Sequence, residues 1–375
     1  MASGPQAEVQ ATVAPLSAQR WSVAQWREHV DVWEALTARA ATDPLFLSWE
    51  WLSSWWSAFG DTLGAAPEVV AFYRRSELIG LVPLYRQHVL RNGFLPAQSL
   101  QVMGLAWRDP EPLISEYLDV IGAQQDLTQL REACVQHLLA DPHWSEFVIG
   151  FSAAGAQWRE AFERSPGSER HYVRELDRSI AYQADLGCGF AAYLQDLEQS
   201  TRRSLWNLRR RLSALGAVRC ESVPADDIEG GFADLNRLHQ LRWHKAAFTG
   251  RRLQFHTTLA QRLAARGELA LSRLRVGAQV VSVLYDIRKG NRQYNIKMAF
   301  DPAFSSRVSL GLIHLGYAME AAAEGGVTIY DLLAGPGRTN NYKRHLSQSR
   351  RALSCVQMLR GPLLPRLYRW RDRRR

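Results

Sequence analysis

Cysteine is scarce in this chain, and its spacing matches no metal site. The four cysteines are Cys134, Cys188, Cys220 and Cys355. No two of them form a C-x-x-C pair, and no histidine stands where it would complete a zinc site. We therefore expect free thiols in a reducing compartment and no bound metal.

Long hydrophobic runs and a leader segment are also missing. Residues 1–20 are rich in Ala, Gln, Ser and Pro, without the cationic start or apolar core of a signal peptide, and we expect them to be disordered. No window approaches the ~18 apolar residues that a membrane span needs. These absences predict a cytoplasmic protein, with a basic C-terminus able to contact the inner membrane surface.

The motifs of several enzyme classes are absent. The chain has no G-x-S-x-G, no P-loop, no H-E-x-x-H and no dinucleotide fingerprint. Serine hydrolase, NTPase, zinc protease and dehydrogenase functions are therefore excluded. The signatures of zinc fingers, helix-turn-helix proteins and RNA-recognition motifs are missing too, which leaves nucleic-acid binding with little support.

What is present is a globular composition of two-domain size. At 375 residues the chain is too long for one ordinary core, and its 46% hydrophobic and 22% charged residues are typical of globular proteins. The segment RSPGSER at 164–170 combines Pro, Gly, Ser and charge, as linkers do. It predicts one domain over 21–165 and a second over 171–360, followed by a basic tail at 361–375.

The net charge of +9 favours anionic partners. Much of the excess lies in a segment with five arginines, at 202–211, and in the C-terminal run that begins at Arg366. Phosphate groups, nucleic acid or an anionic membrane would all suit such clusters. A solvated helix face and a frayed tail are an equally good reading.

The order of elements in 268–346 is the most specific pattern of the chain. Strands are expected near 268–276, 279–288 and 291–300, then a helix capped by Ser305 or Ser306 and running to about 323, then a short buried strand in TIYDLL. A helix that begins where an antiparallel strand ends presents free N–H groups, which can hold a pyrophosphate. The first half has a similar order, without visible residue identity: strands at 69–75 and 78–86, a helix at 127–140 and a strand at 147–151.

Six segments in this order resemble the GNAT acyltransferase superfamily. They are WEWLSSWW near Trp51, ELIGLVPLYR at 77–86, TRRSLWNLRRRL at 201–212, LHQLRWHK at 238–245, FDPAFSSRVSLG at 300–311 and YDLLAGPGRTNNYKRHL at 330–346. The closest resemblance is to the CelD type, found beside cellulose and exopolysaccharide genes, and a more distant one is to the FemABX proteins. The resemblance runs roughly from Trp49 to Leu359. It implies an α/β fold of two tandem GNAT-like domains, each a mixed, mostly antiparallel sheet flanked by helices, with the second domain catalytic.

The resemblance implies acyl-CoA as a co-substrate, with no permanently bound cofactor. In GNAT enzymes the turn before the central helix binds the CoA pyrophosphate, and here that turn carries Ser305, Ser306, Arg307, Ser309 and Gly311. A glycine in the first turns would let the ligand approach the backbone. Arg307 and Val308 stand where the superfamily usually has a glycine-richer loop. The alternative is an ordinary capped helix packed on the sheet.

Four residues are candidates for the chemistry. By resemblance, Lys343 lies beside the reaction centre, where a cation can stabilise an oxyanion, and Asp331 ends the strand before it. Asp286 and Tyr294 are polar residues on expected strands, and they could serve as base and proton donor. The alternatives are a structural ion pair for Asp331 and Lys343, and an exposed sheet face for Asp286 and Tyr294.

Five residues are candidates for the acceptor. Arg203 and Arg210 lie on the polar side of an expected helix over 190–215, opposite a leucine stripe, and could contact an anionic group. Arg242 and Trp243 form an Arg-Trp pair that recurs in the family, and Tyr342 precedes Lys343. A solvated amphipathic helix is the alternative for the arginines.

We therefore expect transfer of an acyl group, most simply acetyl, from acyl-CoA to an amine or hydroxyl. The resemblance implies an acceptor such as an anionic envelope or exopolysaccharide precursor. Two other readings stay open. One is FemABX-like use of aminoacyl-tRNA, and the other is a non-catalytic, degenerate GNAT protein that binds an anionic polymer or a membrane surface.

Overall fold

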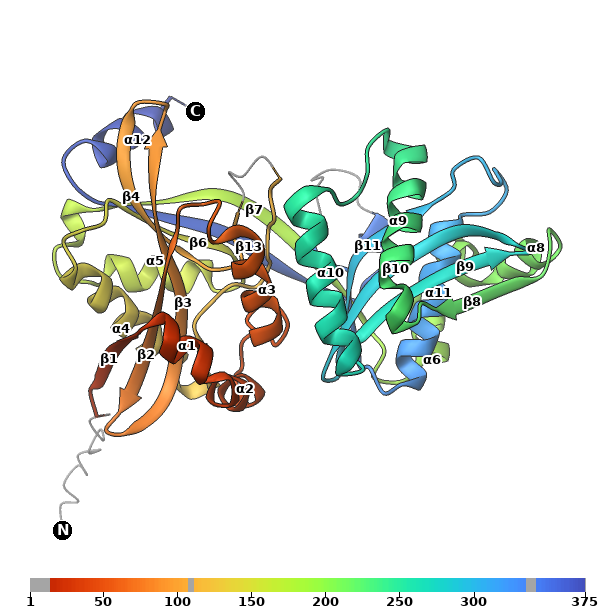
Figure 1. The fold of residues 1–375 in the computed structure, drawn as a ribbon, viewed down its shortest axis with the longest axis horizontal. Coiled ribbons are helices and arrows are strands. Elements are labelled where there is room, and N and C mark those ends of the chain that lie inside the picture. Colours follow the sequence, from red (N-terminus) through yellow and green to blue (C-terminus); the bar gives the residue numbers. More distant parts are fainter. Residues whose placement is uncertain (1–13, 107–110, 335–341, 375) are drawn as a thin grey trace, which may run out of the picture.

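The computed structural model describes residues 14–106, 111–334 and 342–374. Within them, thirteen strands form one mixed sheet in the order β1-β2-β3-β4-β6-β13-β7-β12-β11-β10-β9-β8, with β5 paired to β3, and helices flank it (Figure 1). The strands are β1 Leu16–Trp21, β2 Ala66–Arg74, β3 Glu77–Arg91, β4 Leu95–Val102, β5 Ile121–Gly122, β6 Glu146–Ser152, β7 Tyr172–Asp185, β8 Val218–Ser222, β9 Leu269–Val276, β10 Gln279–Lys289, β11 Arg292–Phe300, β12 Ile329–Asp331 and β13 Ser349–Leu359.

The α-helices cover both faces of this sheet. They are α1 Val23–Glu28, α2 Val30–Arg39, α3 Trp49–Phe59, α4 Leu127–Ala140, α5 Gly155–Glu163, α6 Phe190–Asp196, α7 Gln199–Arg202, α8 Arg209–Ser213, α9 Ile228–Trp243, α10 Gly250–Ala265, α11 Leu310–Glu324 and α12 Leu364–Asp372. A π-helical turn, η3 (Arg203–Asn207), joins α7 to α8, and a 3₁₀ turn, η5, spans Tyr342–Leu346. No helix in the described ranges is both long and apolar enough to cross a membrane.

The two halves of the sheet repeat one pattern. In the first, β1 to β4 are antiparallel neighbours and β6 joins β4 in parallel. In the second, β8 to β11 are antiparallel neighbours and β12 joins β11 in parallel. The predicted α/β fold, a mixed and mostly antiparallel sheet flanked by helices, is confirmed.

Two long strands join the halves. β7 pairs with β12 through residues 183–185 and with β13 through residues 172–183, while β13 also pairs with β6. The last strand of the chain therefore completes the sheet of the first half, and Figure 1 shows β7 and β13 running between the two halves. Each half depends on a strand that lies far away in the sequence.

Helices α3 and α10 bring the halves together above the sheet. The ring of Trp51 on α3 meets Phe255 on α10 at 5.1 Å between centroids. Glu50, which is buried on α3, contacts Arg266 at 2.9 Å and Lys289 at 3.5 Å. An apolar contact and a buried charge network thus hold the second half against the first.

Residues 14–20 and 361–374 are more ordered than the sequence predicts. The expected disorder of residues 1–20 is wrong for β1, which pairs with the outer edge of β2, and Arg20 contacts Glu68 at 3.1 Å and Asp141 at 3.0 Å. The expected basic tail contains helix α12, because Leu364 and Tyr368 are buried against the sheet. Apolar residues interleaved with the arginines give that segment an inner face to bury.

Two internal elements also differ from the prediction. Strand β4 was not predicted. Asn92 and Gly93 close the tight β3–β4 hairpin with positive φ values of 52° and 82°. An Asn-Gly pair is a strong sequence signal for such a hairpin, so this strand could have been predicted. The expected helix over 190–215 is divided among α6, α7, η3 and α8. The irregular turn η3 coincides with close packing against Gly316 of α11. A Cβ on Gly316 would come within 2.4 Å of the Leu205 carbonyl oxygen, so the backbones of α11 and η3 are in close contact.

Candidate active site

Strands β11 and β12 pair over only three residues. Arg292, Gln293 and Tyr294 of β11 face Ile329, Tyr330 and Asp331 of β12, and β12 then ends while β11 continues to Phe300. Among the described residues, the edge of β11 from 295 to 300 that faces away from β10 has no strand partner. Such an edge offers backbone N–H and C=O groups to an extended ligand that carries amides.

Lys343 lies at the end of β12, beside this edge. Its Nζ donates to the carbonyl oxygens of Leu333 at 3.0 Å and Ala334 at 3.3 Å. The backbone N–H of Ala334 donates to the Glu116 carboxylate at 2.9 Å. Burial lowers the pKa of Lys343, Glu116 and Asp331 oppose this shift, and Lys297 adds to it. A lysine with a lowered pKa therefore stands next to the open strand edge, and its catalytic role stays a prediction.

Asp331 is fully buried and enclosed by hydrogen bonds. Its carboxylate accepts from the Tyr117 hydroxyl at 2.8 Å, from Gln183 Nε2 at 2.7 Å and from the backbone N–H of Leu333 at 2.9 Å. Burial raises the pKa of Asp331, and these donors oppose the rise. This geometry fits a residue that fixes the end of β12 and thereby positions Lys343.

The first half contributes a second carboxylate, the partly buried Asp43. The Tyr294 hydroxyl donates to Asp43 Oδ2 at 2.9 Å, and the N–H groups of Leu45 and Phe46 donate to Oδ1 at 3.0 and 3.2 Å. Burial raises the pKa of Asp43 to about 6, and nearby Arg292 opposes the rise. Sequence analysis missed Asp43, Glu116 and Tyr117, because no pattern within the first half links them to β11 or β12.

The predicted base and donor do not form a pair. Asp286 accepts from Gln293 and Asn295, both at 2.8 Å, and from the Tyr330 hydroxyl. Tyr294 stands between Gln293 and Asn295 on β11, so strand alternation directs it to the other face of the sheet. Asp286 and Tyr294 therefore cannot act together on one substrate. Burial raises the pKa of Asp286 to about 6 within its own network.

The predicted pyrophosphate turn has a different cap and a different glycine role. Helix α11 begins at Leu310 with Ser309 as its N-cap, while Ser305 Oγ accepts from the N–H of Arg307 in the preceding turn. The expectation of a cap at Ser305 or Ser306 is wrong, because the helix begins only at Leu310, after a turn in which the Val308 side chain is buried. A Cβ on Gly311 would meet the Phe300 ring at 2.8 Å, so this glycine serves helix–sheet packing.

The predicted acceptor residues are divided between the two faces of the sheet. The guanidinium of Arg242 lies 4.5 Å from the ring centroid of Phe300 and 4.9 Å from that of Trp243. The pKa of Tyr342 is raised by burial and lowered by Arg242, which places these two side chains near each other. Arg203 and Arg210 are exposed at or near η3, which packs on α11 on one face of the sheet. Arg242 belongs to α9, which lies on the other face.

Three cations converge beside β11 without ion pairs among the described residues. Burial lowers the pKa of Lys297, and the charges of Arg252 and Lys245 lower it further. The Nε of Arg252 is buried without a hydrogen-bond partner. Lys297 was not among the predicted site residues, because its cationic neighbours come from distant segments, Lys245 from the α9–α10 connection and Arg252 from α10. A phosphate or carboxylate would offset the mutual repulsion of this cation cluster.

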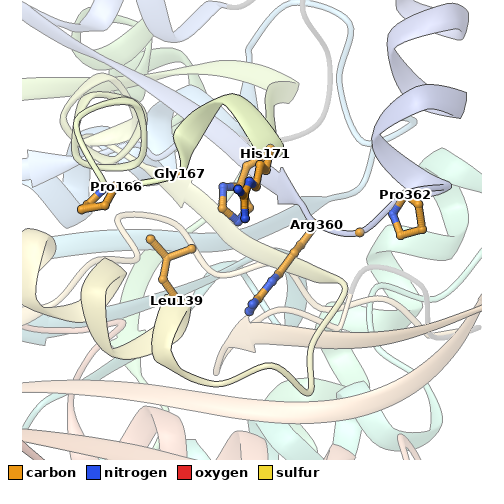
Figure 2. A pocket seen from close by; sticks show the side chains of 8 residues that line it. Leu139, Pro166, Gly167, His171, Arg360 and Pro362 are labelled. Atoms are coloured by element: carbon orange, nitrogen blue, oxygen red, sulfur yellow. The ribbon is translucent and has the colours of Figure 1, made fainter.

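Two cavities are lined by residues other than those of the open β11 edge, 295–300. One of about 260 Å³ has Asp43, Tyr117 and Arg292 in its wall, together with Asp119, Arg131 and Arg351. Another of about 540 Å³ lies where the 164–170 connection meets the end of β13, and Figure 2 shows Arg360 beside Leu139 there. The described residues contain no cluster of three or more His, Cys, Asp or Glu that could hold a metal. The loop 335–341, with its predicted Gly-Pro-Gly turn, lies outside the described residues.

Comparisons with known proteins agree with the fold. Residues 199–344 match the model of the acetyltransferase (GNAT) domain. The fold of the chain is similar to that of FemX, with 10% identity, a TM-score of 0.59 and coverage of 90% of this chain and 96% of that one. L-PGS from Bacillus licheniformis matches with 11% identity, a TM-score of 0.50 and coverage of 92% and 96%. A protein of unknown function from Bacteroides thetaiotaomicron VPI-5482 matches with 13% identity, a TM-score of 0.52 and coverage of 89% and 97%.

No curated protein matches the sequence. The fold comparisons span nearly the whole chain, whereas the domain match is confined to the second half, which holds β11, β12 and Lys343. Residues 199–344 are thus similar to a GNAT acetyltransferase domain, within a chain whose overall fold is similar to that of FemX.

Proposed function

We propose that this protein transfers an acyl group from acyl-CoA to an amine or hydroxyl acceptor. The observation that carries the proposal is the open edge of β11 beside Lys343, within the segment that matches a GNAT domain. The pantetheine arm of CoA carries two amides, and an extended ligand of this kind can pair with a free strand edge.

The reaction requires little covalent chemistry from the protein. The acceptor nitrogen or oxygen attacks the thioester carbonyl, the C–S bond then breaks, and the proton of the acceptor leaves as the CoA thiol forms. The protein holds the two reactants in attacking geometry, which lowers the entropic part of the barrier. A cation at Lys343 would stabilise the oxyanion, and Asp331 and Glu116 would hold the β12 end that positions it.

The cation cluster supports an anionic substrate. Lys297, Arg252 and Lys245 lie beside β11, and Arg242 lies beside Phe300 near the start of α11. Charge-assisted bonds from such groups suit the phosphates of CoA or an anionic acceptor. As the acceptor we propose an envelope or exopolysaccharide precursor, because the sequence resembles the CelD type.

Aminoacyl-tRNA is the second candidate donor. The likeness to FemX covers most of both chains, and exposed arginines, Arg203 and Arg210 among them, line the surface near η3. The resemblance to FemABX proteins suggested such a donor. At this identity, the likeness carries only the fold.

A thermal-shift series separates the donors. The protein is heated with CoA, with acyl-CoAs of increasing chain length and with deacylated tRNA, and Lys297→Gln is compared with the exposed control Arg27→Gln. A ligand at a hundred times its Kd should stabilise the wild type by roughly 2.7 kcal/mol. We expect a shift with acyl-CoA that is smaller in Lys297→Gln than in the control. A shift with tRNA alone would favour the second candidate, and no shift with either ligand would contradict both.

A further inference from the structure

The C-terminal helix α12 carries an outward stripe of alternating apolar and basic residues. Leu363, Arg366, Trp370 and Arg373 stand at positions i, i+3, i+7 and i+10, which align along one side of a helix. All four are exposed, with 64% of Leu363 and 53% of Trp370 accessible. The opposite side of α12 buries Leu364 and Tyr368, so the orientation of the helix is fixed.

The β3–β4 hairpin adds two exposed apolar residues at the same end of the molecule. Tyr368 and Leu364 pack with Ala97, Val89 and Leu95 of this hairpin. Figure 1 shows the last turn of α12 beside the closed end of the hairpin. Phe94 in that turn is 69% exposed and Leu90 is 63% exposed. Large apolar side chains this exposed usually mark an interaction site when they gather.

The charge of this surface has one sign. Arg366, Arg373 and Arg374 have no ion pair among the described residues, and the Arg374 guanidinium lies 3.8 Å from the centroid of the Trp370 ring. The acidic residue of the helix, Asp372, is already paired with Arg174 at 2.6 Å and accepts from the Tyr172 hydroxyl at 3.1 Å. The stripe therefore presents unneutralised positive charge among apolar side chains.

We propose that α12 and the tip of the β3–β4 hairpin form a surface that binds anionic lipid bilayers. Tryptophan prefers the headgroup region, where an apolar ring and a polar N–H are both accommodated, and arginines beside it attract acidic headgroups. A helix with an apolar and basic outer stripe lies in the plane of the interface. We choose a membrane over a protein partner because arginines without ion pairs in the described part of the chain stand between the apolar residues of the stripe, and acidic headgroups would neutralise them.

Vesicle flotation tests this surface on the full chain. Vesicles of phosphatidylcholine alone are compared with vesicles that contain 30 mol% phosphatidylglycerol, a composition chosen to supply anionic headgroups. About 1 kcal/mol per basic residue near an anionic surface corresponds to about fivefold in affinity, so Arg366→Gln/Arg373→Gln should weaken binding roughly 30-fold. The matched control Arg27→Gln/Arg219→Gln removes two exposed arginines elsewhere and should bind as the wild type does.

A second variant separates lipid insertion from simple charge attraction. Phe94→Ser/Trp370→Ser keeps every charge. We expect this variant to bind anionic vesicles more weakly than the wild type does. We also expect its tryptophan fluorescence to shift less to the blue when vesicles are added. Retained binding in this variant, equal losses in the control, or no wild-type binding to the anionic vesicles would overturn the proposal. Binding of an RNA oligomer through the same arginines, without vesicle binding, would assign the surface to nucleic acid instead.

Discussion

The two halves of the sheet share a strand pattern but differ at one cluster of cations. In the first half, buried cations have carboxylate partners: Arg91 contacts Glu146, and Arg131 contacts Asp119 at 2.5 Å. In the second half, buried Arg273 is likewise paired, with Asp227 and Asp234. Lys297 and Arg252, in contrast, lie partly buried beside β11 without an ion pair among the described residues. A partly buried charge without a partner is unfavourable in the free protein, and an anionic ligand at this cluster would relieve the cost.

On the proposed function, the first half is a supporting half and the second, which would carry the reaction, is the reacting half. The domain match covers 199–344, in the second half, while the first half supplies Asp43, Glu116 and Tyr117 to the ends of β11 and β12. We infer that the first half has kept the fold and the bracing contacts. Four substitutions can break or sharpen this comparison.

The largest effect is expected at the buried pair of the first half. Glu146 accepts from Arg91 Nε at 2.7 Å and from Gln357 Nε2 at 2.8 Å, and both ions are almost fully buried. Glu146→Ala leaves a buried cation unpaired, which should lower the free energy of unfolding by about 3–5 kcal/mol. Chemical denaturation measures it, with Glu160→Ala, from an exposed pair with Arg164, as a control expected to lose about 0–1 kcal/mol. A similar small loss in both variants would mean that the first-half pairs are not structural.

Much of this architecture could be predicted from the sequence, because local patterns encode it. Strands β9, β10 and β11 were predicted within two residues at each end, since alternating apolar residues and the turns at Gly277 and Gly290 mark them. The exchange of β7 and β13 between the halves could not be predicted, because strand pairing across the chain leaves no local signal. Lys343 was predicted as a site residue by resemblance, and its role stays a prediction. Asp43 and Glu116 were missed, because only tertiary contacts bring them to β11 and to the end of β12.

The next largest effect is expected at Lys343, in the reacting half. If Lys343 stabilises the oxyanion, Lys343→Ala should lower kcat and kcat/KM alike, by roughly two to three orders of magnitude. Release of the CoA thiol, with the acyl-CoA that gives the largest thermal shift, measures the rate. The variant also loses the bonds to the Leu333 and Ala334 carbonyls, so some loss of stability is expected. Lys343→Arg is the matched variant, because it keeps charge and donors. An active Lys343→Ala that melts much earlier would show a purely structural lysine.

A smaller, pH-dependent effect is expected at Asp43, where the halves meet. Its folded-state pKa of about 6 lies above its usual value of 3.8. Between these values the folded protein keeps a proton that the unfolded chain loses, so the contribution of Asp43 to stability falls as the pH rises through this window. Asp43→Asn cannot titrate and should gain stability relative to the wild type between pH 4 and 7, by roughly 1–3 kcal/mol. Denaturant titrations at both pH values measure this, with the exposed Asp61→Asn as the control. A pH-independent difference between Asp43→Asn and the wild type would contradict the assignment.

The smallest effect is expected at Lys297, and it tests the comparison most directly. Because burial and the charges of Arg252 and Lys245 disfavour its cation, Lys297→Met should leave stability unchanged or slightly raised. The same change removes a charge-assisted contact to an anionic ligand, so the affinity for CoA, or for inorganic pyrophosphate as a minimal probe, should fall about tenfold. Titration calorimetry of Lys297→Met against Arg219→Met, an exposed arginine on β8, gives the affinities, and denaturation gives the stabilities. Unchanged affinity together with a clear loss of stability would make Lys297 a structural residue like the paired cations of the first half. The contrast between the halves would then fail at its central residue.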